Sequence, residues 1–96
     1  METLFEWDVP KAVSNLAKHG VSFDEAPTVF ADPLARTLRD EDHSWDERRE
    51  ILVGHSAGMR LLVVCFTERD GEVIRIFSAR EATRRERENY EKSTYS

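Results

Sequence analysis

The sequence predicts one α+β domain of two layers, with helices packed on an antiparallel sheet. Three observations lead to this prediction. Hydrophobic residues have helical spacing in the first third of the chain and alternate with a period of two further on. Turn and capping residues separate these periodic segments. The 96 residues, 40% hydrophobic and 34% charged, are typical of a single globular domain with a modest core.

The first expected elements are a short strand at residues 5–7 and a helix over residues 11–19. Asp8 before Pro10 is a helix start signal, and Gly20 is a stop signal. Asp8 is also of a residue type that caps helices. Helical spacing gives the helix an apolar face with Ala12, Leu16 and His19, and a second face with Lys11, Asn15 and Lys18. Periodicity therefore directs Lys18 to solvent.

A second helix is expected to begin near Ser22, which forms a capping box with Glu25. Pro27 lacks the amide that would bond to the Phe23 carbonyl, so this helix should kink or start late. The Asp32-Pro33 pair ends the segment. Its expected buried stripe consists of Phe23, Ala26, Val29 and Phe30.

Four strands and a helix are expected in the remainder of the chain. The strands cover residues 34–39, 48–54, 60–67 and 73–79, with a polar loop at 40–46 and turns at 55–58 and 69–71. Asp70-Gly71 is a strong hairpin signal. Thr83 and Glu86 form a capping box that opens a charged helix through about Lys92, and residues 93–96 are expected to be a frayed tail.

The strand at residues 60–67 is apolar on both sides. One side carries Leu61, Val63 and Cys65, and the other carries Leu62, Val64 and Phe66. An antiparallel sheet that is covered on one face alternates apolar and polar residues instead. Because the first two helices can cover only one face, the second face must be covered by the last helix, a second subunit or a partner protein.

The charge of the chain is unevenly distributed. The net charge is −5, with 6 basic and 12 acidic residues in 1–50 but 8 basic and 7 acidic residues in 51–96. Residues 69–87 alone hold six arginines and four acids. This pattern argues against long-range attraction of nucleic acid, yet it is compatible with a local positive site on an acidic body.

Several classes of protein are excluded or disfavoured. No apolar run approaches the ~20 residues of a membrane helix, and the first residues lack a basic signal-peptide head, so a cytoplasmic location is expected. Cys65 is the only cysteine, so no internal disulfide is possible, and its place in the apolar run 61–66 favours a buried, inert thiol. His19, His43 and His55 are too scattered for a standard metal site, and no cofactor motif is present.

Arg80 is the first candidate for a functional residue. Strand alternation places it on the row of Ile74, Ile76 and Ser78, at the point where the strand ends and the helix begins. A guanidinium at this rim can bind a phosphate with two parallel hydrogen bonds. The alternative is a salt bridge to Glu81 or Glu86, which spacing alone favours.

Three further candidates also have a structural alternative. Arg60 opens the strand next to that of Arg80, and spacing alone favours a solvated side chain. Tyr90 lies one helical turn beyond Glu86, where a core-edge aromatic is favoured over a hydroxyl that lines a cleft. His19 precedes Gly20, where a core histidine or a helix C-terminal charge is the commoner role.

A set of short stretches, in a fixed order along residues 5–91, carries a family resemblance. These stretches are Phe5-Glu6-Trp7-Asp8, Asn15, Lys18-His19-Gly20-Val21, Phe23, Asp32-Pro33, His43-Ser44, Glu47, Arg49, Gly54, Ser56, Gly58, Arg60, Thr67-Glu68-Arg69, Arg75-Ile76, Ser78-Ala79-Arg80, Ala82, Glu86 and Tyr90. The ordered set resembles the BrnT toxin family, a branch of the RelE-like ribonuclease fold. No single stretch is diagnostic, but the order is specific.

The resemblance implies a RelE-like α+β fold and an RNA-cleaving toxin. It also implies a BrnA-like antitoxin partner that itself binds operator DNA, with a homodimer as a further expectation within the complex. In the RelE-like fold the catalytic arginines come from the sheet, and Arg60 and Arg80 occupy such places. The resemblance further implies roles for Tyr90, which the last helix supplies, and for His19 as the group that titrates near neutral pH.

The implied chemistry needs neither a metal nor a cofactor. A 2′-hydroxyl attacks the adjacent phosphorus, arginines stabilise the developing charge, and a base and an acid move the two protons. The competing hypotheses are a regulatory binding module without catalysis and a structural subunit of a heterodimer. If Arg60, Arg80 and His19 lie around one cleft, within reach of a single phosphate, catalysis is favoured over these alternatives.

Overall fold

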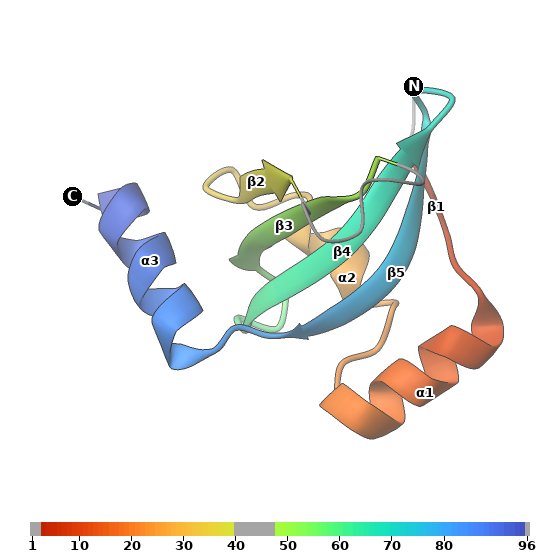
Figure 1. Cartoon of the computed structure of the whole chain (residues 1–96), viewed down its shortest axis with the longest axis horizontal. Helices are drawn as coiled ribbons and strands as arrows, with labels where there is room; N and C mark the ends of the chain where they lie inside the picture. Colours follow the sequence, from red (N-terminus) through yellow and green to blue (C-terminus); the bar gives the residue numbers. More distant parts are fainter. Residues whose placement is uncertain (1–2, 40–47, 96) are drawn as a thin grey trace.

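The computed structural model describes residues 3–39 and 48–95. These residues form five strands and three helices, whose arrangement is drawn in Figure 1. In chain order these are β1 (Leu4–Glu6), α1 (Val9–His19), α2 (Ala26–Val29), β2 (Arg36–Arg39), β3 (Glu50–His55), β4 (Leu61–Arg69), β5 (Val73–Glu81) and α3 (Arg84–Tyr95). The predicted α+β class and order of elements are confirmed. The expected loop at 40–46, and His43, Ser44 and Glu47 of the resemblance, lie outside the described residues.

The strands form one mixed sheet in the order β1-β5-β4-β3-β2. Strands β2 to β5 are antiparallel neighbours, as predicted. The prediction of a wholly antiparallel sheet is wrong, because β1 pairs parallel to β5, with Leu4 opposite Val73. β1 precedes both N-terminal helices, so no hairpin turn joins it to a neighbouring strand. It pairs instead with β5, the last strand of the chain.

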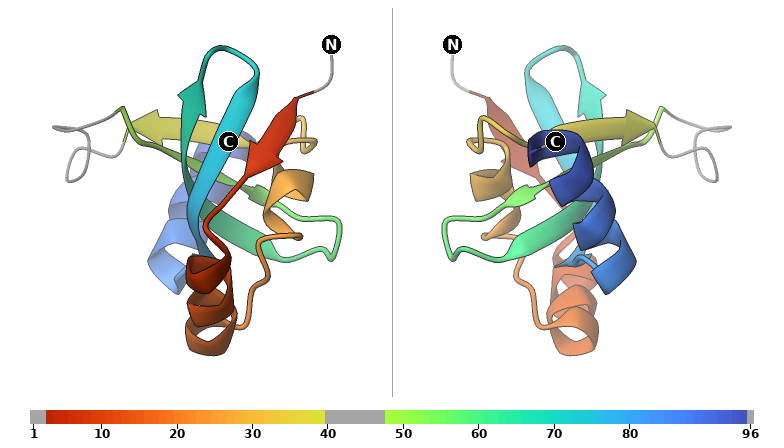
Figure 2. Two further views of the ribbon diagram at one scale, coloured as in Figure 1. Left: turned by 90° about the vertical axis from the view of Figure 1, so that its right-hand side faces the viewer. Right: turned by 90° about the vertical axis from the view of Figure 1, so that its left-hand side faces the viewer.

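The sheet separates two unequal cores. On one face α2 packs on the larger core, which includes Ala26, Val29, Leu62, Val64 and Phe66. On the other face α3 contributes Tyr90 to a smaller core with Val53, Leu61 and Val63. Figure 2 shows α2 and α3 on opposite sides of the sheet, so the prediction of two layers is wrong. The last helix therefore covers the second apolar side of β4, but only in part.

α1 is held at the end of the sheet by a buried asparagine. The Asn15 side chain donates to the carbonyls of Ala79 and Val21 at 2.7 and 3.0 Å, and it accepts from the Ala79 amide at 3.2 Å. The predicted apolar face is wrong in part, because Leu16 is 51% exposed while Asn15 is buried. These three bonds turn the asparagine toward β5, with Ala12 beside it.

The ends of α1 follow their sequence signals. Asp8 caps the first turn by accepting from the Lys11 amide at 3.1 Å, and Pro10 occupies the first turn. Gly20 ends the helix in a left-handed conformation with φ +70°, and its amide bonds to the Leu16 carbonyl at 2.8 Å.

The other two helices differ in length from the prediction. α2 has only four residues and starts late, consistent with the effect expected of Pro27. The Ser22 hydroxyl accepts from the Glu25 amide at 3.2 Å, but the Glu25 carboxylate points to Arg60 instead of closing the capping box. α3 continues to Tyr95, so the frayed tail expected from residue 93 is wrong.

A β-bulge in β5 changes which way its last residues point. Cys65 pairs with Ser78, but the next residue of β4, Phe66, pairs with Ile76, so one residue of β5 is extra. Ile76 consequently faces the α2 core together with Ala79, three residues later. The predicted row from Ile74 to Arg80 is therefore wrong, and Arg80 lies on the α3 face opposite Val63.

Candidate functional site

Two adjoining cavities cross the part of the α3 face that α3 leaves open. The first, of about 390 Å³, includes Arg49, Arg80 and Lys11 in its lining. The second, of about 350 Å³, includes Lys18 and His19 and shares Lys11, Phe77 and Ser78 with the first. Together we call them the cationic groove. Among the described residues, none that lines either cavity is acidic.

Phe77 organises the middle of this groove. It is the extra residue of the β5 bulge and lines both cavities. The Arg49 guanidinium carbon lies 3.9 Å from the centroid of its ring, and the Lys11 Nζ lies 5.6 Å from it. Cations over a ring face are attracted by its negative quadrupole. The bulge therefore holds two positive charges, which come from distant parts of the chain, beside the middle of β5.

Arg80 makes a forked ion pair with Glu86 on α3. Its two terminal nitrogens donate to the two carboxylate oxygens at 2.7 and 2.8 Å. Glu86 also closes the capping box, because it accepts from the Thr83 amide at 2.9 Å and its own amide donates to the Thr83 hydroxyl at 3.1 Å. The salt bridge that spacing favoured is thus present, and the predicted capping box is confirmed.

The charges of this pair stabilise each other. Hydrogen bonds from Arg80 outweigh burial and, with those from Thr83, lower the pKa of Glu86 to about 2. The same carboxylate raises the pKa of Arg80, although burial opposes this. The pair leaves Arg80 fully charged, with its planar fork already directed at two oxygen atoms, as in the recognition of a phosphate.

His19 enters the groove from the end of α1. The flank of α1 that carries Lys11 and Lys18 faces Phe77 and Ser78, so His19 and Arg80 line cavities that share a wall. Lys18 is exposed, as predicted, but it borders this groove rather than open surface alone. The structure therefore brings Arg80 and His19 to one groove.

Tyr90 lies beneath α3 rather than in the groove. It is 3% exposed and packs on Val53, Leu61 and Val63, in the manner of a core-edge aromatic. Its ring meets that of His55 edge to face, with 5.6 Å between centroids. Burial opposes ionisation of the neighbouring Asp32, but hydrogen bonds from the His55 and Leu34 amides, with the His55 charge and the Tyr90 hydroxyl, lower its pKa on balance.

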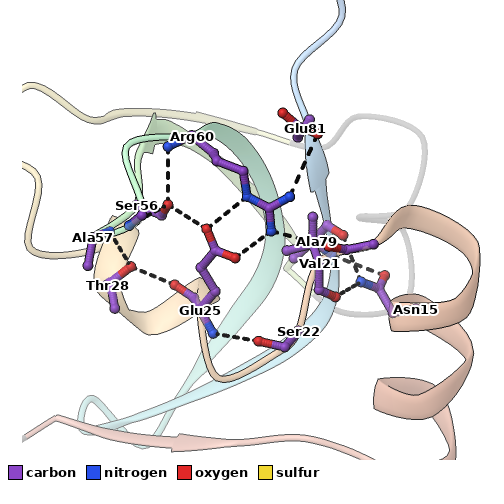
Figure 3. A network of polar contacts seen from close by, with 12 residues as sticks. Asn15, Val21, Ser22, Glu25, Thr28, Ser56, Ala57, Arg60, Ala79 and Glu81 are labelled. Atoms are coloured by element: carbon purple, nitrogen blue, oxygen red, sulfur yellow. Dashed lines mark hydrogen bonds and ion pairs between the residues drawn. The ribbon is translucent and has the colours of Figure 1, made fainter.

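Arg60 lies on the opposite side of the sheet, in the polar network of Figure 3. Its Nε donates to Glu25 at 3.1 Å, and its Nη2 bonds to the same carboxylate and to the Gly20 carbonyl, the latter at 3.2 Å. The Ser56 hydroxyl donates to Glu25 at 2.6 Å. The hydrogen bonds from Arg60 outweigh burial and lower the pKa of Glu25. This network ties the turn before β4 to the α1–α2 connection.

The four predicted site residues therefore do not surround a single cleft. Arg80 and His19 share the groove. Tyr90 lies in the core between α3 and the sheet, and Arg60 is bound on the α2 side. Sequence reasoning missed the part played by Lys11, Arg49 and Phe77. Lys11 and Lys18 share one face of α1, which was a usable signal, but the bulge that turns Phe77 into the groove has no sequence signature.

Across residues 3–39 and 48–95, no group of three or more His, Cys, Asp or Glu side chains is placed to hold a metal ion. No helix in the same part of the chain has the length and apolar character needed to cross a membrane.

Comparisons with known proteins agree with the sequence resemblance. Residues 7–86 match the family model described as "Ribonuclease toxin, BrnT, of type II toxin-antitoxin system". The fold is similar to the crystal structure of the Brucella abortus ribonuclease toxin BrnT, with a TM-score of 0.66 and 23% identity, covering 88% of this chain and all of the other. No curated protein sequence matched. Because the family model spans most of its length, the chain belongs to the BrnT family of ribonuclease toxins of type II toxin–antitoxin systems.

Proposed function

We propose that this chain is an endoribonuclease toxin that cleaves RNA in the cationic groove. One observation carries the proposal: on a protein with a net charge of −5, the described lining of this groove contains Lys11, Lys18, Arg49 and Arg80 and no acid. A polyanion is the ligand that such a surface recognises, through contacts with successive phosphates. The negative charge elsewhere restricts this attraction to the groove.

The scissile phosphate is assigned to Arg80. Glu86 presents two oxygens to the guanidinium in the geometry that a phosphate would adopt, so the carboxylate holds the place of the substrate in the free protein. Binding of RNA then exchanges one bidentate partner for another. Arg49, oriented on Phe77, supplies a second positive charge in the same cavity.

The proposed reaction is an internal transesterification. The 2′-oxygen attacks the adjacent phosphorus, the bond from phosphorus to the 5′-oxygen breaks, and the products are a 2′,3′-cyclic phosphate and a 5′-hydroxyl. One group takes the proton of the 2′-hydroxyl, and another gives a proton to the leaving oxygen. Arg80 stabilises the negative charge that develops on the phosphorus oxygens, and this charge stabilisation does not depend on a metal.

Further roles are assigned to the other three predicted residues. His19 supplies one of the two proton-transfer groups, since it lies across the shared wall of the groove from Arg80. Tyr90 positions α3, and with it Glu86, through its packing on β3 and β4. Arg60 positions the turn at residues 56–59 against the α1–α2 connection.

A BrnA-like antitoxin is the proposed partner, with both proteins in the cytoplasm and operator DNA contacted only through the antitoxin. The toxin–antitoxin family to which the chain belongs supports an antitoxin as the partner. Part of the apolar side of β3 and β4 remains beside the groove, where the neutralising chain would exclude RNA.

The test combines growth with cleavage in vitro. Expression of the chain alone should arrest bacterial growth and degrade RNA, and co-expression with its antitoxin should restore growth. Purified protein should cleave RNA equally in the presence and absence of EDTA. A Lys11→Ala, Arg49→Ala double variant should lose most cleavage, whereas Arg84→Ala, which removes a side chain that is 93% exposed outside the groove, should not. Normal growth with intact RNA at confirmed soluble expression would overturn the proposal.

A further inference from the structure

A third cavity, of about 290 Å³, lies between β2, β3, β4 and α3. Its apolar lining includes Val53, Val63 and Tyr90, which are 8, 7 and 3% exposed. The rim is polar and includes the Asn89 amide. We call this cavity the α3 pocket. An apolar interior with few polar groups at the rim is typical of small-ligand sites.

The α3 pocket is continuous with the cationic groove at Arg80. Ile51 and Val63 line both cavities, and Glu86, which lines the α3 pocket, is the residue that binds Arg80. A ligand with an anionic group at Arg80 would therefore have its next chemical group at the entrance of this pocket. In RNA, the groups attached beside a backbone phosphate are a ribose and its base.

The size and the far wall of the pocket favour one small planar group over a polypeptide segment. Its volume is at the lower end of the range for ligand cavities. Arg36 lines the pocket and donates to the Ser93 carbonyl at 3.2 Å, which joins β2 to the last turns of α3. This bond joins two walls of the pocket, which favours a compact site over a long groove.

The rim supplies a group that can read a base edge. Asn89 is exposed on α3, one position before Tyr90, and its amide offers both a donor and an acceptor. Asparagine amides form bidentate hydrogen bonds with base edges in protein–nucleic acid complexes. The apolar interior accepts the faces of the ring, as in other sites that take an unstacked base.

We propose that the α3 pocket binds the nucleobase of the nucleotide whose phosphate lies at Arg80, with Asn89 determining which base is preferred. This proposal rests on the proposed function, because it takes the groove as the site of the RNA backbone. It assigns sequence preference to α3 and β2, and phosphate binding to β5 and α1. A substitution in the α3 pocket should therefore change the base preference but not phosphate binding, and a substitution in the groove should do the opposite.

The experiment measures the binding of inorganic phosphate and of the four nucleoside 3′-monophosphates by calorimetry. The wild-type protein should bind the nucleotides more tightly than phosphate and should discriminate among the bases. Asn89→Ala should reduce this discrimination about tenfold. Leu38→Trp, at a 56% exposed position that lines the pocket, should weaken nucleotide binding toward the affinity of phosphate. Phosphate binding itself should not change in either variant.

The matched controls are Glu91→Ala, an exposed change on α3 outside the pocket, and Leu34→Trp, which adds the same ring at a 48% exposed position outside its lining. Both should bind all ligands as the wild type does. If the nucleotides bind no better than phosphate, the α3 pocket does not bind the nucleobase, although the groove can still bind the phosphate. A Leu38→Trp variant that loses antitoxin binding but keeps its nucleotide affinity would also overturn the role of the pocket. Failure of phosphate and of every nucleotide to bind would contradict the proposed function as well.

Discussion

The two faces of the sheet each place an arginine at the end of a strand and give it a glutamate. The side chains of Arg60 and Arg80 are 33 and 37% exposed, so exposure does not distinguish them. Their surroundings do. Glu25, the partner of Arg60, also accepts from Ser56, and Arg60 itself bonds to a backbone carbonyl. Glu86, the partner of Arg80, lies on a helix that is anchored to the sheet mainly through Tyr90.

This difference shows how one kind of ion pair can serve two purposes. On the α2 face, the pair is one part of a network that joins two loops. Removing Arg60 takes away its bond to the Gly20 carbonyl and leaves Ser56 as the side-chain partner of the Glu25 carboxylate. On the α3 face, the pair stands beside an open groove, and a substrate phosphate can replace the carboxylate. The same contact geometry is therefore a structural tie on one face and an exchangeable site on the other.

The largest expected effect is the loss of cleavage in Arg80→Ala. Removing one preorganised donor to a developing oxyanion lowers the rate by about a hundred- to a thousandfold. Arg80→Lys should recover only part of this, because lysine keeps the charge but not the planar fork. Stability should change by at most about 1 kcal/mol, as for exposed ion pairs. Single-turnover cleavage measured beside urea unfolding checks both numbers, with Arg84→Ala as the control.

Asn15→Ala should give the largest loss of stability. The substitution leaves the Ala79 amide and two carbonyls without their partners, which costs about 2 kcal/mol. Because Asn15 holds α1 against β5, the loss should also loosen the Lys11 side of the groove and reduce cleavage. Val13→Ala, at a 66% exposed position of α1 outside the lining of the groove, serves as the control. An unchanged urea midpoint in Asn15→Ala would contradict this anchoring role.

Glu86→Gln should tighten RNA binding several-fold, because phosphate no longer competes with a carboxylate for Arg80. The pKa of Glu86 is about 2 in the folded protein against an ordinary 4.5. Since the folded value is the lower one, the ionised pair stabilises the fold above pH 4.5, and this contribution is lost as the pH falls toward 2. Wild type should therefore lose more urea stability than Glu86→Gln across this window. Weaker RNA binding by the variant would instead make Glu86 a positioning residue for Arg80.

Arg60→Ala should have the smallest effect on the chemistry. Its network lies on the α2 face, so the rate of cleavage per folded molecule should stay within about twofold of wild type, below the effect of losing one oxyanion donor. The urea midpoint should fall, because Glu25 and the Gly20 carbonyl lose their partner. A large drop in the single-turnover rate at unchanged stability would return Arg60 to the catalytic site and remove the contrast between the two faces.

Local signals in the sequence were sufficient for much of the fold. Asp8 and Gly20 bound α1, Thr83 and Glu86 cap α3, and the two apolar sides of β4 meet two cores. Each of these features depends on residues that are close in the chain or on a simple period. The sequence could not show that β1 joins the sheet parallel to β5. That pairing joins two segments far apart in the chain and depends on how the elements between them pack.

The site was less predictable, and β5 explains why. Strand alternation placed Arg80 with Ile74 and Ile76, but the bulge shifts Arg80 to the opposite face. The alternation of residues in the strand that Arg60 opens could not indicate its ion pair with Glu25, which is 35 residues earlier in the chain. Only the salt bridge of Arg80 to Glu86, six residues away, was accessible from spacing. Contacts between distant segments decide which cations share a groove.

The most direct test is to determine where RNA binds on the folded protein. A non-cleavable 2′-O-methyl oligonucleotide can be titrated into the isotopically labelled chain and followed by NMR. We expect the shifted amides to lie around the groove, at Lys11, His19, Phe77 and Arg80, while the amide signals of Glu25, Ser56 and Arg60 stay in place. Shifts confined to the α2 face, with the groove unaffected, would contradict it.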